Sequence, residues 1–66
     1  MKLKQGQIWK TENAYLLIVE WHRLAIAYQS AESHEALENG GEVIHVTKKE
    51  FCRLLKSAEL VFEPMH

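Results

Sequence analysis

Large apolar residues alternate with alanine along one segment of the chain. Residues 24–28 read Leu-Ala-Ile-Ala-Tyr, so a large side chain recurs at every second position. A period of two places these side chains on one face of a β-strand. The apolar run 14–29 could otherwise form one buried helix. The alternation, together with the aromatic and β-branched residues before it, predicts two strands near 14–21 and 24–29, joined by a tight turn at His22-Arg23.

The first of these strands is apolar on both faces. Leu16 and Ile18 fall on one face, and the other face carries four large side chains, Tyr15, Leu17, Val19 and Trp21. A sheet that packs one face on its core leaves the opposite face without a cover. We therefore expect this second face to lie under the helix predicted at residues 48–56 or against another protein chain, and we predict it as a protein-contact surface.

Shorter patterns predict the remaining elements. One or two helical turns are expected from Ser30, as the N-terminal cap, to Glu38, with Asn39-Gly40 as the stop. Apolar runs predict three further strands, at 7–10, 42–46 and 60–62.

A helix is predicted at residues 48–56. Thr47 stands three residues before Glu50, so its hydroxyl can accept the Glu50 amide while the carboxylate reaches back to the Thr47 amide. Cys52 falls at the border of the apolar face and is expected to pack as a small hydrophobe. At 100° per residue that apolar face consists of Phe51, Leu54, Leu55 and Ala58. The opposite, basic arc consists of Lys49, Arg53 and Lys56.

These elements predict a mainly β fold, a small SH3-like barrel of five strands with one helix before the last strand, as a single domain over residues 1–66. The chain resembles a loose class of short, mostly uncharacterised bacterial and phage proteins of SH3-like build. These open with a Gly-x-x-Trp strand, here Gly6-Gln7-Ile8-Trp9. They close with a Ser/Thr-x-x-Glu/Asp-Phe-x-x-x-Leu helix, here from Thr47 to Leu55. The likeness spans about residues 5–63 and implies a fold rather than an activity.

The length of 66 residues allows one small core, and folding at this size removes only about 60% of the unfolded surface from water. The single Cys52 cannot form an internal disulfide, so self-association is the expected supplement to stability. One cysteine, and a basic start without an apolar core after it, predict a cytoplasmic protein. No membrane span is expected, because the apolar run 14–29 is short and carries charges in its middle.

Catalytic and metal chemistry have weak support in the sequence. His22, His34, His45 and His66 do not pair at spacings that would place two imidazoles together on one element. Glu20 and Glu42 would need a cleft to act as an acid/base pair, which so short a chain rarely builds. Gly40-Gly41 lacks the lysine of a phosphate-binding loop. We therefore expect a protein that is not an enzyme and has no catalytic residues, metal or cofactor.

Two function hypotheses remain. The first is a protein-interaction or assembly module, most simply a two-fold homodimer, that uses the second face of the 14–21 strand; Trp21→Glu should then release monomers. The second is nucleic-acid binding through Lys49, Arg53 and Lys56 with Trp21 as a stacking residue. The net charge of −1 does not discriminate between these two hypotheses, because charges of opposite sign are separated along the chain. Residues 32–42 are acidic and residues 48–56 are basic. Trp9 and Tyr28 are expected in the core.

Overall fold

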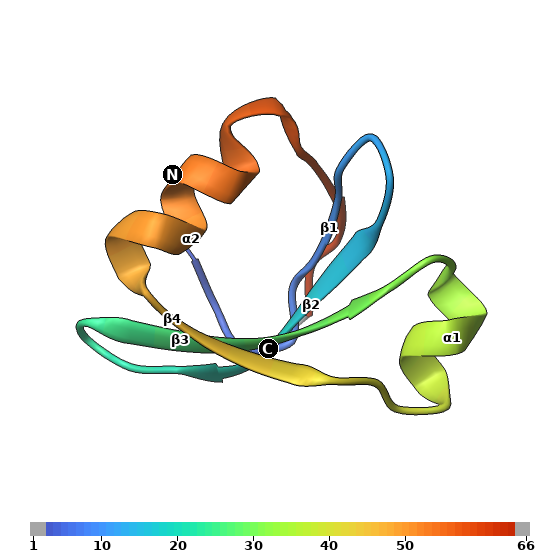
Figure 1. The fold of residues 1–66 in the computed structure, drawn as a ribbon, viewed down its shortest axis with the longest axis horizontal. Coiled ribbons are helices and arrows are strands. Elements are labelled where there is room, and N and C mark those ends of the chain that lie inside the picture. The colour runs from blue at the N-terminus through green and yellow to red at the C-terminus, as the bar shows by residue number, and fades with distance from the viewer. Residues whose placement is uncertain (1–2, 65–66) are drawn as a thin grey trace.

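Residues 3–64 form a five-stranded antiparallel sheet with two short α-helices in the computed structural model (Figure 1). Helix α1 (His34–Glu38) connects the third strand to the fourth. Helix α2 (Lys48–Leu54) and the 3-10 helix η1 (Leu55–Ser57) connect the fourth to the fifth. The strands are β1 (Ile8–Lys10), β2 (Tyr15–Trp21), β3 (Ala25–Ala31), β4 (Val43–Thr47) and β5 (Glu59–Phe62). The predicted mainly β fold is confirmed, as are two strands rather than one helix after residue 14, although β3 runs to Ala31 and not to residue 29.

The sheet stays open. The strand order is β4-β3-β2-β1-β5, so β4 and β5 lie at its two edges rather than pairing with each other. Figure 1 shows β1 and β5 turned away from β3 and β4, with α2 across the space between them. The strands therefore do not form the predicted closed barrel. Phe51 and Leu55 from the connection between β4 and β5 are buried there, so helical side chains fill the space that strand pairing would close.

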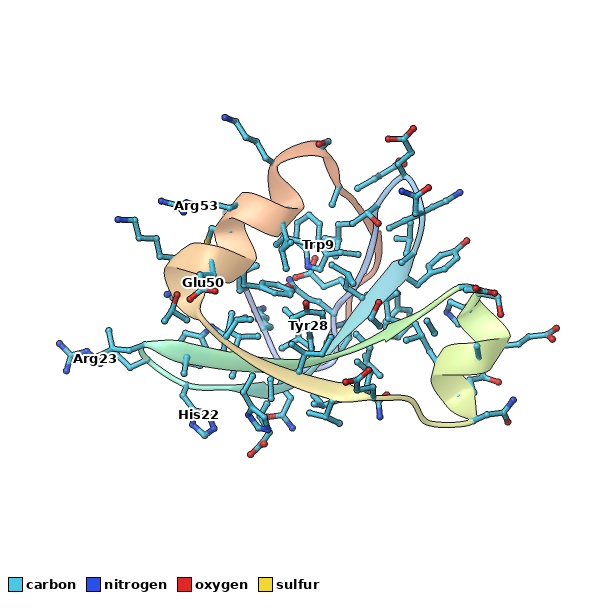
Figure 2. All side chains as sticks on the ribbon, in the orientation of Figure 1. Trp9, His22, Arg23, Tyr28, Glu50 and Arg53 are labelled. Atoms are coloured by element: carbon cyan, nitrogen blue, oxygen red, sulfur yellow. The ribbon has the colours of Figure 1, made fainter. Side chains whose placement is uncertain are left out.

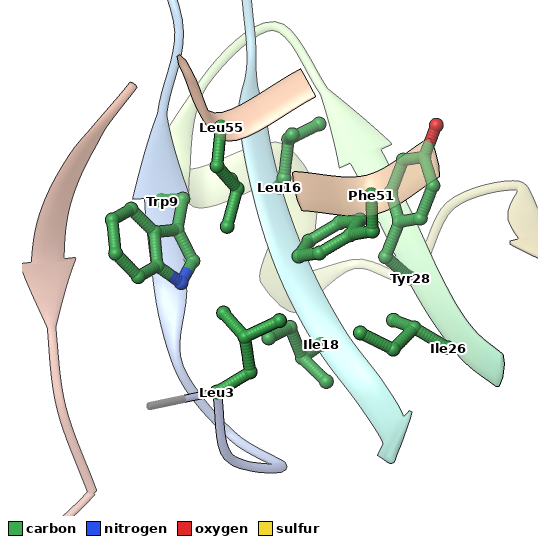
Figure 3. Close-up of a cluster of buried hydrophobic side chains, with 8 residues drawn as sticks. All are labelled: Leu3, Trp9, Leu16, Ile18, Ile26, Tyr28, Phe51 and Leu55. Carbon is green, nitrogen blue, oxygen red and sulfur yellow. The ribbon is translucent and has the colours of Figure 1, made fainter. Parts of the chain in front are cut away.

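The core lies between α2 and the inner face of the sheet. Tyr28 and Phe51 are in ring contact, with centroids 5.1 Å apart, and Phe51 is fully buried. Burial raises the pKa of the Tyr28 phenol above its ordinary value. Figure 3 shows the whole cluster, which consists of Leu3, Trp9, Leu16, Ile18, Ile26, Tyr28, Phe51 and Leu55. The expected core positions of Trp9 and Tyr28 are confirmed.

Helix α1 begins later than the sequence predicts. Ser30 pairs with Leu16 in the β2–β3 ladder, so it belongs to a strand and cannot cap a helix. Ser33 takes that role, because its hydroxyl accepts the Ala36 amide at 3.1 Å. The predicted stop is confirmed: Asn39 is the C-terminal cap, and Gly40 follows with φ of +84°, a left-handed conformation that glycine adopts without strain.

Helix α2 begins at the predicted cap, but its apolar face is narrower than predicted. Only Phe51 and Leu55 are fully in the core, whereas Leu54 is 45% exposed and Cys52 is also exposed. A helix this short touches the sheet along one line of side chains. Neighbours on either side of that line, such as Leu54 and Cys52, therefore face solvent. The expectation that Cys52 packs as a small hydrophobe at the border of the apolar face was wrong, because its side chain is exposed.

Thr47→Ala should lower the free energy of unfolding by about 1 kcal/mol. The Thr47 hydroxyl accepts the Glu50 amide at 3.1 Å and donates to the Glu50 carboxylate at 3.2 Å, so alanine removes both bonds. Urea denaturation followed by circular dichroism measures the loss. Thr47→Ser keeps the hydroxyl and is the control; equal losses in the two variants would contradict a capping role.

Candidate functional site

A β-bulge divides the predicted contact face of β2. Ile18 pairs with Tyr28, but Glu20 pairs with Ala27 and Trp21 with Ile26, so Val19 is an extra residue on the β2 side. Residues directly opposite each other in an antiparallel pair point to the same side of the sheet. Trp21 therefore shares the side of the buried Ile26, whereas Tyr15 and Leu17 point to the outer face, away from the core. The predicted four residues do not share one face.

The outer face of the sheet carries an apolar hollow of about 270 Å³. Ile8 of β1 lies opposite both Leu17 of β2 and Phe62 of β5, which makes a row of three apolar side chains across three strands. Helix α1 adds Leu37, with His34 and Glu38 at the border. Of the predicted contact residues, only Leu17 lines this hollow.

Tyr15 and Val19 do not line the hollow and are half-buried. The Tyr15 ring meets the His34 ring edge-on at 6.1 Å, and the Lys10 ammonium lies 5.7 Å from the Tyr15 centroid. Helix α1 therefore covers part of this face. The expectation that the helix at residues 48–56 covers it was wrong, because Phe51 and Leu55 pack on the inner face of the sheet instead. The hollow next to α1 is the part of the outer face that stays open.

Ile8, Leu37 and Phe62 are site residues that the sequence reasoning did not identify. Each belonged to a predicted element, but their meeting depends on β1 lying between β2 and β5 and on α1 folding over the outer face. The apolar Leu37 among the glutamates of α1 was a usable signal, because a single apolar position in a polar helical turn marks its buried side.

Strand β5 is an edge whose four residues are all exposed. Its apolar residues Leu60, Val61 and Phe62 stand between Glu59 and Glu63. An antiparallel pairing of two β5 strands would set Glu59 of one copy against Glu63 of the other, and like charges in opposite positions destabilise a sheet. The acidic ends of β5 therefore work against edge-to-edge pairing of two copies.

The basic arc is solvent-exposed, as predicted, and the fold adds two cations to it. Lys49, Arg53 and Lys56 are exposed on α2 and η1. Arg23, from the turn between β2 and β3, lines one hollow of about 520 Å³ together with Lys48 and Lys49. Figure 2 shows Arg23 at the tip of that hairpin and Arg53 on α2, both pointing away from the core.

The remaining polar residues form no metal cluster. No group of three or more His, Cys, Asp or Glu side chains within residues 3–64 is placed to hold a metal ion. His22 lies 3.6 Å from the Glu20 carboxylate, and His34 packs on Tyr15. His66 lies outside the described residues. In the same part of the chain no helix has the length and apolar character needed to span a membrane.

Comparisons of the chain with protein-family models, with curated proteins and with solved structures find no match.

Proposed function

We propose that this chain is a non-catalytic protein-interaction or assembly module of SH3-like build that associates through the outer face of its sheet. The strand order β4-β3-β2-β1-β5, with a helical connection between the two edge strands, supports the SH3-like assignment. The observation that carries the functional proposal is the open apolar hollow formed by Ile8, Leu17, Leu37 and Phe62.

The hollow has the character of a contact site. Four of its six lining residues are large and apolar, and one of them, Phe62, is 49% exposed. An apolar hollow next to an exposed aromatic side chain marks a contact surface, because burial of that area against a partner removes it from water at about 25 cal/mol per Å². A second such chain can supply an apolar side chain that fills the space.

A second copy of the chain is the occupant that the surrounding charges favour. On the outer face the Lys10 ammonium lies over the Tyr15 ring, and Glu38 lines the hollow. A two-fold axis repeats every contact between the two copies. Lys10 of each copy can therefore face Glu38 of the other, which gives two opposite-charge pairs. Because the ends of β5 repel each other, the contact is face to face rather than through the β5 edges.

Phe62→Glu should weaken self-association at least about tenfold, because it places an unpaired charge beside the apolar hollow. Trp21→Glu introduces the same charge on the opposite side of the sheet and is the matched control, expected to leave the association unchanged. Sedimentation velocity across the micromolar range measures both variants beside the parent chain. This reverses the sequence-based expectation, in which Trp21 itself belonged to the contact.

Two results would contradict the proposal. One is a parent chain that sediments as a monomer over the whole micromolar range. The other is dissociation by Trp21→Glu with no effect of Phe62→Glu. Far-ultraviolet circular dichroism of each variant separates loss of association from loss of folding, since β5 contributes to the sheet at its edge only.

A further inference from the structure

The hollow beside Arg23 brings together two segments that are far apart in the sequence. Arg23 and Leu24 come from the turn between β2 and β3, whereas Lys48, Lys49 and Cys52 come from α2. This cationic groove lies at the hairpin and α2, away from the hollow on the outer face. It is therefore a second surface, which the proposed association does not use.

The two walls of the cationic groove are tied to each other. The Lys48 amide donates to the Leu24 carbonyl at 3.0 Å, and Thr47 pairs with Ala25 in the β3–β4 ladder. These bonds set the position of the turn against the start of α2. The backbone positions from which these cations project are consequently fixed relative to each other before any ligand binds, so binding does not have to order the two segments.

Most of the cations of the chain gather at this end of the molecule. Five of its eight lysine and arginine residues lie here, namely Arg23, Lys48, Lys49, Arg53 and Lys56. The acidic residues 32–42 lie in and around α1, which Figure 1 shows at the opposite end of the sheet from α2. Because charges in water are screened over about 8 Å at physiological salt, the local positive charge governs this surface despite the net charge of −1.

The carboxylates nearest to the groove do not neutralise it. Glu50 accepts a hydrogen bond from Thr47 and lines another hollow on the far side of α2, together with Arg53 and Leu54. Glu20 contacts His22. Arg53 thus shares its side of the helix with a carboxylate, whereas the groove cations Arg23, Lys48 and Lys49 have no carboxylate among the residues that line their hollow.

Exposed apolar side chains accompany these cations. The Lys48 ammonium lies 5.2 Å from the centroid of the Trp21 ring, which is 40% exposed, and Leu24 in the groove is 76% exposed. Cations that track a phosphate backbone, next to an aromatic ring on which a base can stack, are the two elements with which proteins bind single strands. A duplex offers its phosphates but keeps its bases stacked inside.

We propose that the cationic groove binds the sugar-phosphate backbone of a single-stranded nucleic acid, with Arg23, Lys48 and Lys49 on the phosphates and Trp21 and Leu24 against the bases. From Lys48 to Lys56 the helical rise covers roughly 12 Å, which is enough to follow a few phosphates of one strand. The site therefore includes a residue of the β2–β3 turn, in addition to the helix face that the sequence indicated.

Fluorescence anisotropy of a labelled oligothymidylate of about 15 nucleotides, titrated with the full chain at several salt concentrations, tests the proposal. Each phosphate contact contributes about 0.7 to the slope of log affinity against log salt for a single strand. Arg23→Gln and Lys49→Gln should each lower that slope by about 0.7. Lys4→Gln removes the same charge at a residue that lines neither the groove nor the hollow of the proposed association, and it should leave the slope unchanged.

The outcomes are distinct. Salt-dependent binding that is weakened by Arg23→Gln and Lys49→Gln, and abolished by the triple change Lys49→Glu/Arg53→Glu/Lys56→Glu, supports the groove. No binding at low salt overturns it, as does binding that Arg23→Gln leaves unaffected. Equal or tighter binding to a labelled polyglutamate peptide of the same length overturns it in favour of an acidic protein partner. Circular dichroism confirms that each variant keeps its fold.

Discussion

Phe51→Ala is expected to remove much or all of the stability of the protein. Phe51 is fully buried, is in ring contact with Tyr28 and is the residue by which α2 is anchored in the core. Replacing a buried phenylalanine with alanine costs about 3–5 kcal/mol through lost burial and the cavity that remains. A domain of 66 residues has a total stability of roughly 3–10 kcal/mol, so the loss takes up much or all of it.

Thermal and urea denaturation followed by circular dichroism measures this effect. Leu54→Ala is the matched control, since Leu54 lies on the same helix but is 45% exposed, and it should cost less than about 1 kcal/mol. A Phe51→Ala protein that unfolds at the same urea concentration as Leu54→Ala would show that α2 is not anchored through this residue.

Gln7→Met is expected to destabilise the protein by about 2–6 kcal/mol. The Gln7 side chain is 1% exposed, and its carbonyl oxygen accepts from the Lys4 amide at 3.0 Å and from the Trp9 indole Nε1 at 3.2 Å. Its amide nitrogen donates to the Glu63 carboxylate at 3.4 Å. Methionine keeps the length of the side chain but removes the acceptor for two N–H groups, and each orphaned donor costs about 1–3 kcal/mol.

A double-mutant cycle isolates the bond to the indole. Trp9→Phe removes the indole donor while leaving an aromatic ring in the core, so Gln7→Met should cost less in that background than in the parent. Urea midpoints of the four proteins measure the coupling. Strictly additive effects would mean that the Gln7 to Trp9 bond contributes nothing to stability.

The strands and the second helix could be predicted because their signals are contained in a few consecutive residues. The alternation from Leu24 to Tyr28 indicates a strand within five positions, and Thr47 caps a helix through an amide only three residues away. Phe51 and Leu55 mark the buried line of α2 for the same reason. The Ser30 cap failed because its pairing with Leu16, a residue distant in the chain, outweighed the local signal.

The candidate sites were only partly predictable, because they depend on how separate segments meet. The hollow on the outer face needs β1 between β2 and β5, with α1 folded over it, and that arrangement brings Ile8, Leu37 and Phe62 to Leu17. Leu37, among the glutamates of α1, carries a local signal of burial, but Ile8 and Phe62 carry no local mark of a contact role. Strand order follows from the burial of the whole sheet, so a pattern of period two cannot specify it.

By itself the sequence determined a mainly β fold, the capped helix after Thr47 and a basic arc on that helix, since each depends on neighbours within one or two turns or a short strand. Only the tertiary structure decided the side on which Trp21 lies and the partners of Lys49. The extra residue in β2 at Val19 reverses the facing of Trp21, and hairpin pairing brings Arg23 to Lys48 and Lys49. Both results follow from the register between strands, which is set by which residues the packed core can bury together.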